Sequence, residues 1–262
     1  STRDVQNMSD RIETFDVGDH VRVVAATRTG DITVVGGPSG SVRVALDGGG
    51  VADYEIGQVG DVISVEPRRK GRFIGSSTDI VLAVPSSAGL ELSCTSGEIL
   101  VQVPVAELRA SVASGDVRVD SVKTVCRVNS ASGDIRLNHA QDAEINTASG
   151  TVRLGRVDRT LRLNAASGNV YIDSIGDSAT AKVASSDIRI GSFEGSDIRV
   201  KTMSGDLHLG IPPRRTVELD FSSLSGRLRN KLPVGDSGPS EKTLIISVAA
   251  VSGDLTLSGA MS

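Results

Sequence analysis

Acidic and basic side chains recur at fixed positions after a Ser-Gly pair along this chain. In the segment Ser114-Gly115-Asp116-Val117-Arg118, the acid follows the glycine directly and the arginine stands two residues later. The same arginine position is filled in further units, by Arg136, Arg153 and Arg189. A row of guanidinium groups can hold a repetitive anionic partner, such as a cell-envelope polymer or a lipid surface. These four arginines are therefore a candidate interaction surface.

The acids of the same units suggest two other interpretations. They stand at Glu98, Asp116, Asp134, Asp187, Asp206 and Asp254. Alternating with the arginines, they would neutralise the row and leave a soluble exterior. Lyases and hydrolases of polysaccharides also occur among repetitive β-folds, but their catalytic residues break the repeat, whereas these acids form it. We therefore predict no enzyme and no catalytic residue.

The densest basic run lies outside these units. It comprises Arg68, Arg69, Lys70 and Arg72, with Arg214-Arg215 as a shorter second run. Contact with anionic lipid headgroups would contribute about 1 kcal/mol per charge, which is too little for stable anchoring. A solvated loop is the alternative interpretation. We add the first run to the candidate interaction surface.

The segment Gly235-Asp236-Ser237-Gly238-Pro239 matches the short string around the nucleophile of trypsin-like proteases. That chemistry needs a histidine base and a buried aspartate in a double β-barrel. His20 and His139 precede the serine, but neither lies in a matching context. A turn between two repeat units explains the string.

The remaining histidines and cysteines predict no metal site and no disulfide. His20, His139 and His208 lie far apart in the sequence, so they form no ligand cluster. Cys94 stands three residues before its glycine and Cys126 seven before its own. We expect both to be buried, two repeat units apart, at about 10 Å, which is too far for a disulfide. No cofactor is predicted.

The spacing of the Ser-Gly pairs predicts the fold. The glycine position recurs at residues 97, 115, 133, 150, 168, 186 (a serine) and 205, so successive units are 17 to 19 residues long. Aliphatic residues alternate with polar ones on both sides of each pair, as in Val117 and Val119 or Leu161 and Leu163. Each unit therefore contains two strands joined by a turn. Stacked units predict an all-β, right-handed parallel β-solenoid with coils of about 18 residues.

The repeat also predicts the organisation of the chain. Residues 1–14 form a polar segment, and residues 15–262 form one solenoid domain. Within that domain we expect irregular coils over 15–88, regular repeats over 89–210 and looser coils with an insertion over 211–262. A third apolar position, seven residues after each glycine, gives every coil another inward contact.

Composition excludes several classes of protein. The 262 residues contain 2% aromatics and 39% hydrophobics, and the net charge is −4. The aliphatic content excludes a disordered chain, and the acidic balance gives no basic footprint for nucleic acid. Neither a signal peptide nor a membrane-spanning segment is visible, so a cytoplasmic location is expected.

The repeated Ser-Gly-Asp-aliphatic-Arg units, together with Ile80-x-Leu82-x-Val84-Pro85, resemble a known bacterial family. This is the "putative adhesin" or Toastrack-type β-strand-repeat family, which is common in actinobacteria and whose function is largely unknown. The resemblance covers roughly residues 15–257. It implies a binding or assembly module, because some relatives lie beside membrane-stress sensor domains, and the adhesin label implies export.

Two functional hypotheses follow. The first is a non-enzymatic binding or scaffold solenoid with a protein or envelope component as its partner, linked to envelope or stress functions and able to contact a membrane surface. The second is self-assembly into end-to-end dimers or filaments, because the unit Ser252–Leu257 lies close to the chain end without a visible cap and terminal strands expose unpaired backbone groups. The change Leu255→Asp would then disrupt the assembly. A glycan-active enzyme is a third, weaker alternative.

Overall fold

The computed structural model describes residues 10–68, 77–232 and 242–260. The chain divides into two compact units, residues 1–133 and 134–262. Regular structure in the described residues is β-strand, apart from the single 3-10 turn η2 (Val51–Asp53). The all-β prediction is confirmed. No helix in these ranges is long and apolar enough to cross a membrane.

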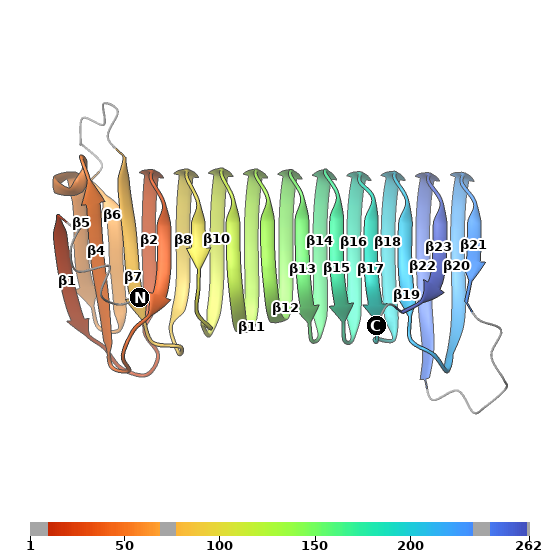
Figure 1. The fold of residues 1–262 in the computed structure, drawn as a ribbon, viewed down its shortest axis with the longest axis horizontal. Helices are drawn as coiled ribbons and strands as arrows, with labels where there is room; N and C mark the ends of the chain where they lie inside the picture. Colours follow the sequence, from red (N-terminus) through yellow and green to blue (C-terminus); the bar gives the residue numbers. More distant parts are fainter. Residues whose placement is uncertain (1–9, 69–76, 233–241, 261–262) are drawn as a thin grey trace. The chain divides into compact units, whose positions relative to one another are not determined.

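Unit 1 contains the regular coils that the repeat predicts. Each coil has one strand before the Ser-Gly turn and one after it, and equivalent strands pair in parallel, forming a pre-turn stack and a post-turn stack (Figure 1). The strands are β2 (Arg22–Thr29), β3 (Ile32–Gly36), β8 (Gly89–Ser96), β9 (Ile99–Val101), β10 (Glu107–Ser114) and β11 (Val117–Ser132). The parallel β-solenoid prediction is confirmed.

One regular coil lies within the range expected to be irregular. Strands β2 and β3 pair in register with β8 and β9, with Val23 opposite Leu90 and Ile32 opposite Ile99. The intervening chain forms β4 (Ser41–Gly48), β5 (Tyr54–Val59), β6 (Val62–Pro67) and β7 (Thr78–Val84). Strands β6 and β7 in turn pair in parallel with β2 and β3. The range 15–88 therefore contains two stacked coils, with β4 and β5 inserted between them in the sequence.

Antiparallel strands form one end of unit 1. Strand β1 (Arg11–Asp16) pairs antiparallel with β4, β4 with β7, and β5 with β6. Strand β1 begins inside the 1–14 segment, which the sequence analysis left outside the solenoid. Tyr54 is buried here, and its hydroxyl donates to Thr27 Oγ1 at 2.8 Å. Neighbouring strands therefore run antiparallel where the parallel stack ends, and the buried ring of Tyr54 covers the end of the core.

Unit 2 repeats the same two-stack arrangement. Its first coils are formed by β12 (Ile135–Ser149), β13 (Val152–Val157), β14 (Thr160–Ser167), β15 (Val170–Ile175), β16 (Ser178–Ser185), β17 (Ile188–Phe193), β18 (Asp197–Ser204) and β19 (Leu207–Ile211). The remaining strands are β20 (Arg215–Ser225), β21 (Leu228–Lys231), β22 (Lys242–Ser252) and β23 (Leu255–Gly259).

The last coil in the sequence is not the last coil of the stack. Strand β22 pairs with β18 on one side and β20 on the other, and β23 lies between β19 and β21 (Figure 1). Leu255 is opposite both Leu207 and Leu228 and is 1% exposed. The expectation that Ser252–Leu257 forms an open end is therefore wrong, and Leu255→Asp would place a charge in the core.

The core consists of stacked aliphatic columns. Leu90, Leu108 and Cys126 occupy one inward column of unit 1, and Cys94 occupies another, opposite Val112. All of these side chains are buried. The third inward contact is also confirmed, because Val122, Ala140, Val157, Ile175 and Phe193 are each 0% exposed. The alternation leaves every second side chain of the long strands facing solvent.

Candidate binding surfaces

Aspartates of the turns connect neighbouring coils. In each contact, a carboxylate Oδ1 accepts the backbone N–H of the equivalent residue in the adjacent coil. In unit 1, Asp79 accepts from Asp31, and Asp31 accepts from Glu98. In unit 2, the series runs from Asp187 through Asp206 and Asp254 to Arg227, with N···O distances of 2.8–2.9 Å. These carboxylates bond between coils rather than within their own turn.

The arginines three residues after the glycine form columns beside these turns. In unit 2, Arg136 is opposite Arg153, and Tyr171 separates Arg153 from Arg189. Arg153 pairs with Asp134 at 3.6 Å, and its guanidinium lies 5.5 Å from the centre of the Tyr171 ring. In unit 1, Arg118 pairs with Glu98 and Asp116. Acids of the turns thus neutralise part of the column, while its side chains stay about half exposed.

Of the first basic run the structure describes only Arg68, whereas it describes both residues of the second run. Arg68 is exposed directly after β6, and its backbone N–H donates to Asp53 O at 2.7 Å. Arg69, Lys70 and Arg72 lie outside the described residues, as does the Gly235–Pro239 string. In the second run, the Arg215 guanidinium donates to the carbonyl oxygens of Glu194 and Gly195. Arg215, the first residue of β20, therefore connects this strand to the segment between β17 and β18.

A groove of about 270 Å³ opens on the outer face of the pre-turn stack in unit 1. Strands β2, β8 and β10 line up here so that Gly89 lies between Arg22 and Glu107 in one row. Because Gly89 has no side chain, this row has a gap one side chain wide. His20, Arg109 and Thr124 complete the polar walls.

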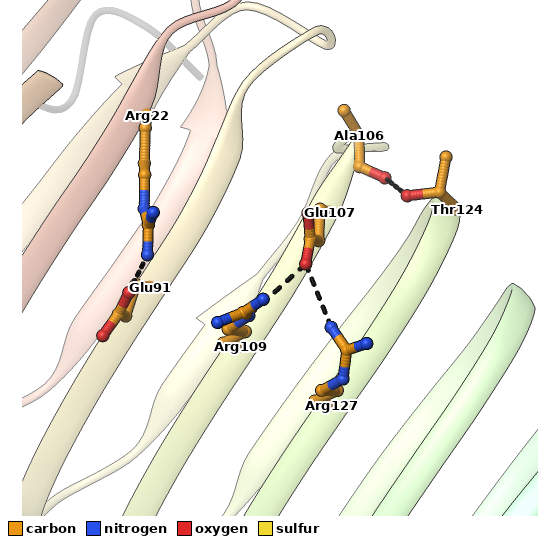
Figure 2. A network of polar contacts seen from close by, with 7 residues as sticks. All are labelled: Arg22, Glu91, Ala106, Glu107, Arg109, Thr124 and Arg127. Atoms are coloured by element: carbon orange, nitrogen blue, oxygen red, sulfur yellow. Dashed lines mark hydrogen bonds and ion pairs between the residues drawn. The ribbon is translucent and has the colours of Figure 1, made fainter.

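Two groups of ion pairs lie on the strands beside this gap, and Figure 2 shows their side chains. Arg22 pairs with Glu91 on one side, and Glu107 accepts from both Arg109 and Arg127 on the other, at 3.4 and 3.1 Å. The five side chains are 38–53% exposed, so solvent screens the pairs and each contributes little to stability. The sequence analysis singled out none of these five residues.

A second charged cluster lies in unit 2. His139 Nε2 is 2.9 Å from Asp158 Oδ2, and Arg156 Nε donates to Asp158 Oδ1 at 2.7 Å. Arg156 also lies 3.7 Å from Glu194. The hydrogen bonds from Arg156 and His139 lower the pKa of Asp158. The bond to Asp158 and the negative charge of Glu194 raise the pKa of Arg156. In the described ranges, no group of three or more His, Cys, Asp or Glu residues is arranged to hold a metal ion.

The cysteines are buried thiols. Burial raises the pKa of Cys126 to about 12 and that of Cys94 to about 11. Both are free, and they occupy different columns two coils apart, as the sequence predicts. A thiol held in its neutral form is neither a nucleophile nor a metal ligand.

Exposed apolar side chains gather on the last coils of unit 2. Met203, Val251 and Leu224 occupy outward positions of β18, β22 and β20, which are adjacent strands. They are 65%, 50% and 86% exposed. Among the described strands, β20 pairs only with β22 and β21 only with β23, so their coil ends the stack. This end differs from the charged faces elsewhere in the unit.

The fold therefore places the chain in a class of β-repeat domain, a solenoid whose coils turn at Ser-Gly pairs and are linked by aspartate side chains. The family model Toastrack DUF4097 matches residues 53–258. The chain therefore belongs to the Toastrack DUF4097 family, which confirms the resemblance in its repeat units. No curated protein matches the sequence.

Several solved structures are similar to this chain at low sequence identity. A putative lipid binding protein from Parabacteroides distasonis is 14% identical, with a TM-score of 0.53, and the alignment covers 95% of this chain and 97% of that one. A putative adhesin from Bacteroides fragilis is 13% identical, with a TM-score of 0.48 and coverage of 95% and 98%. A putative adhesin from Parabacteroides distasonis is 10% identical, with a TM-score of 0.47 and coverage of 94% and 96%.

Proposed function

We propose that this chain is a non-enzymatic binding module that attaches to a polymer of the cell envelope. The turn carboxylates carry the proposal. Asp187 and Asp206 are among the acids that a catalytic reading of the repeat would need, and each accepts a backbone N–H of the adjacent coil. Two further acids of this set, Glu98 and Asp116 in unit 1, form ion pairs with Arg118. Acids engaged in this way hold the scaffold together, and the descriptions of the similar solved structures name adhesion or binding rather than a reaction.

The spacing of the exposed side chains supports a polymer as the partner. Equivalent residues of neighbouring coils lie about 4.8 Å apart, so Arg136 and Arg153 present guanidinium groups on successive coils, and Arg189 continues the same line beyond Tyr171. A chain of repeating anionic units can make the same contact at successive coils, and its binding gains from multivalency. The contact is electrostatic and should weaken as salt increases.

Co-sedimentation with purified cell-wall sacculi, with and without their anionic polymers, tests this proposal. We expect the protein to sediment with intact sacculi, to be released by salt and to liberate no soluble sugar. The triple variant Arg136→Gln/Arg153→Gln/Arg189→Gln should bind several-fold more weakly, while Arg162→Gln/Arg199→Gln, on the outer face of the other stack, should not. Protein that stays in the supernatant, or sugar released over time, would overturn the proposal.

Self-association is a second candidate, and the apolar row of Met203, Val251 and Leu224 favours it. Exposed apolar side chains on adjacent strands mark interaction sites more often than isolated ones do. A second copy of this chain offers the same row and the same end coil, so an isologous contact would bury both at once.

Light scattering across a concentration series tests the second candidate. We expect the mass to grow with concentration for the natural sequence and to stay monomeric for Leu224→Lys. Val59→Lys is the matched control, because Val59 is 84% exposed on β5 of unit 1 and Leu224 is 86% exposed. Monomers at every concentration, or equal growth in both variants, would contradict self-association through this row.

A further inference from the structure

We infer that the partner polymer contains sugar rings, and that one of these rings stacks on the aromatic side chain of Tyr171. This inference rests on the proposed function, because it names the chemical class of the polymer that the arginine column binds. The alternative partner is a polyanion without rings, such as a chain of phosphates.

Tyr171 differs from the other aromatic residues of the chain in its exposure. Its side chain is 38% exposed, whereas Tyr54 and Phe193 are buried, and Phe15 and Phe221 are partly buried. No other aromatic ring in the described ranges is exposed. A tyrosine on the outer face of a strand offers a partner an apolar ring and a polar hydroxyl together.

The ring interrupts the column of cations in unit 2. Tyr171 is opposite Arg153 on one side and Arg189 on the other. A partner that is bound by charge alone loses one contact at this coil, which weakens multivalent binding. Separation of like charges does not account for the ring, because Arg136 and Arg153 are directly opposite each other. A sugar ring accounts for it, because the C–H groups on one face of a pyranose form an apolar surface that packs on an aromatic ring.

One face of the Tyr171 ring is held and the other is free. The guanidinium of Arg153, on β13, lies over the ring at 5.5 Å from its centre, and this contact orients the ring. Within the described ranges, Arg189 on β17 forms neither an ion pair nor a ring contact. The ring face toward β17 is therefore available to a ligand. An oriented tyrosine loses little conformational freedom when it is covered.

Polar groups on both sides of the ring suit the hydroxyl groups of a sugar. Asn169, Tyr171 and Asp173 occupy alternate exposed positions at the start of β15 and just before it. Asn169 Nδ2 donates to the Tyr171 hydroxyl at 3.4 Å. Gly155 and Gly191 occupy the place of Asp173 in the adjacent coils, so no side chain stands beside its carboxylate there. An amide that donates and a carboxylate that accepts can both bind sugar hydroxyls.

Calorimetric titration of the full chain with two polyanions tests the inference. Tetragalacturonate consists of sugar rings with carboxylates, and tetrapolyphosphate carries its charges without rings. In Tyr171→Val, we expect tetragalacturonate to bind about fivefold more weakly because the aromatic face is lost, and tetrapolyphosphate to bind as before. Tyr171→Phe is the matched control, because it keeps the ring and should bind both ligands like the natural sequence. Arg136→Gln keeps the ring but removes a cation, so it should weaken both ligands.

Tyrosine fluorescence reports on the ring itself. The chain has two tyrosines and no tryptophan, and Tyr54 is buried. Quenching by acrylamide therefore reports mainly on Tyr171. We expect bound tetragalacturonate to protect the fluorescence from the quencher and bound tetrapolyphosphate to leave the quenching unchanged.

Several outcomes would overturn the inference. Tetragalacturonate binding that is absent in the natural sequence, or equal in Tyr171→Val, would show that the ring contacts no sugar. Equal weakening of both ligands in Tyr171→Val would limit the ring to supporting the arginines. Quenching that bound tetragalacturonate leaves unchanged would place the sugar elsewhere.

Sacculus binding separates this inference from the proposed function. If Tyr171→Val sediments with sacculi like the natural sequence, while the triple arginine variant does not, the sugar-ring inference fails and the proposed function stands. If the natural sequence binds neither polyanion and does not sediment with sacculi, both fail.

Discussion

The backbone N–H of Asp254 donates to Oδ1 of Asp206 at 2.8 Å, although 48 residues separate them. Asp206 in turn donates its own N–H to Asp187 Oδ1 at 2.9 Å. The two bonds place three turns in spatial order and connect the inserted coil β22–β23 to the regular repeat. The carboxylates of Asp187 and Asp206 therefore each bond to the adjacent coil.

Replacing Asp206 tests this connection. Asp206→Ala removes the acceptor of the Asp254 N–H, and because the bond is exposed and water can replace it, we expect the free energy of unfolding to fall by about 0.5–1.5 kcal/mol. Asp206→Asn keeps an acceptor oxygen and should cost less. Urea denaturation measures both, with Asp173→Ala, an exposed aspartate of β15, as the control. Equal stabilities for the Asp206 and Asp173 variants would contradict a structural role for the link.

Much of the fold could be predicted from the sequence because one period governs most of it. Columns such as Leu90, Leu108 and Cys126 follow directly from counting residues around each glycine. The stacking order of β20 and β22 could not be predicted in this way. Strand β22 carries Leu244, Ile245 and Ile246, whereas β20 carries Glu218 and Asp220, so the more apolar strand takes the place that is covered on both sides.

The groove escaped sequence analysis for a related reason. Its row joins Arg22 to Gly89 and Glu107, and the first two are separated by an insertion that breaks the period. Only the alignment of Val23 with Leu90 fixes which side chains become neighbours. The alternating aliphatic residues of 21–27 and 89–95 are visible in the sequence. Which of the charged residues between them become neighbours can be stated only once the register of the strands is known.

Gly115 tests the close approach of successive turns. Its φ is 139°, and a Cβ there would lie 1.9 Å from the carbonyl oxygen of Gly97. Gly115→Ala combines backbone strain with a steric clash, so we expect a loss of about 3 kcal/mol or more. Gly259→Ala meets no neighbour and should change stability by less than about 1 kcal/mol. Thermal unfolding of the two variants checks the difference, and similar values would refute the packing argument.

The buried thiol of Cys126 predicts that the stability of the fold decreases at high pH. Burial raises its pKa from 9.0 to about 12, so above pH 9 the unfolded chain releases this proton while the folded chain retains it. The contribution to stability is fully present below pH 9 and is lost as the pH rises toward 12. We expect the stability difference between the natural sequence and Cys126→Ala to shrink over that range in urea titrations. A constant difference would contradict the assignment, as would rapid modification of the native thiol at pH 8.

The carboxylate of Asp158 predicts that the stability of the fold decreases as the pH falls in the acid range. The hydrogen bond from Arg156 and that from His139 lower its pKa below 3.8, so its contribution is present above that value and is lost as the pH falls through the lowered pKa. The side chain is 38% exposed, so the contribution should stay below about 1 kcal/mol. In Arg156→Gln, we expect the Asp158 pKa, measured by carboxyl NMR, to rise toward 3.8. Glu194→Gln is the control, because Glu194 contacts Arg156 at 3.7 Å and reaches Asp158 only through it. A pKa of Asp158 that is the same in both variants would show that Arg156 is not the main cause of the shift.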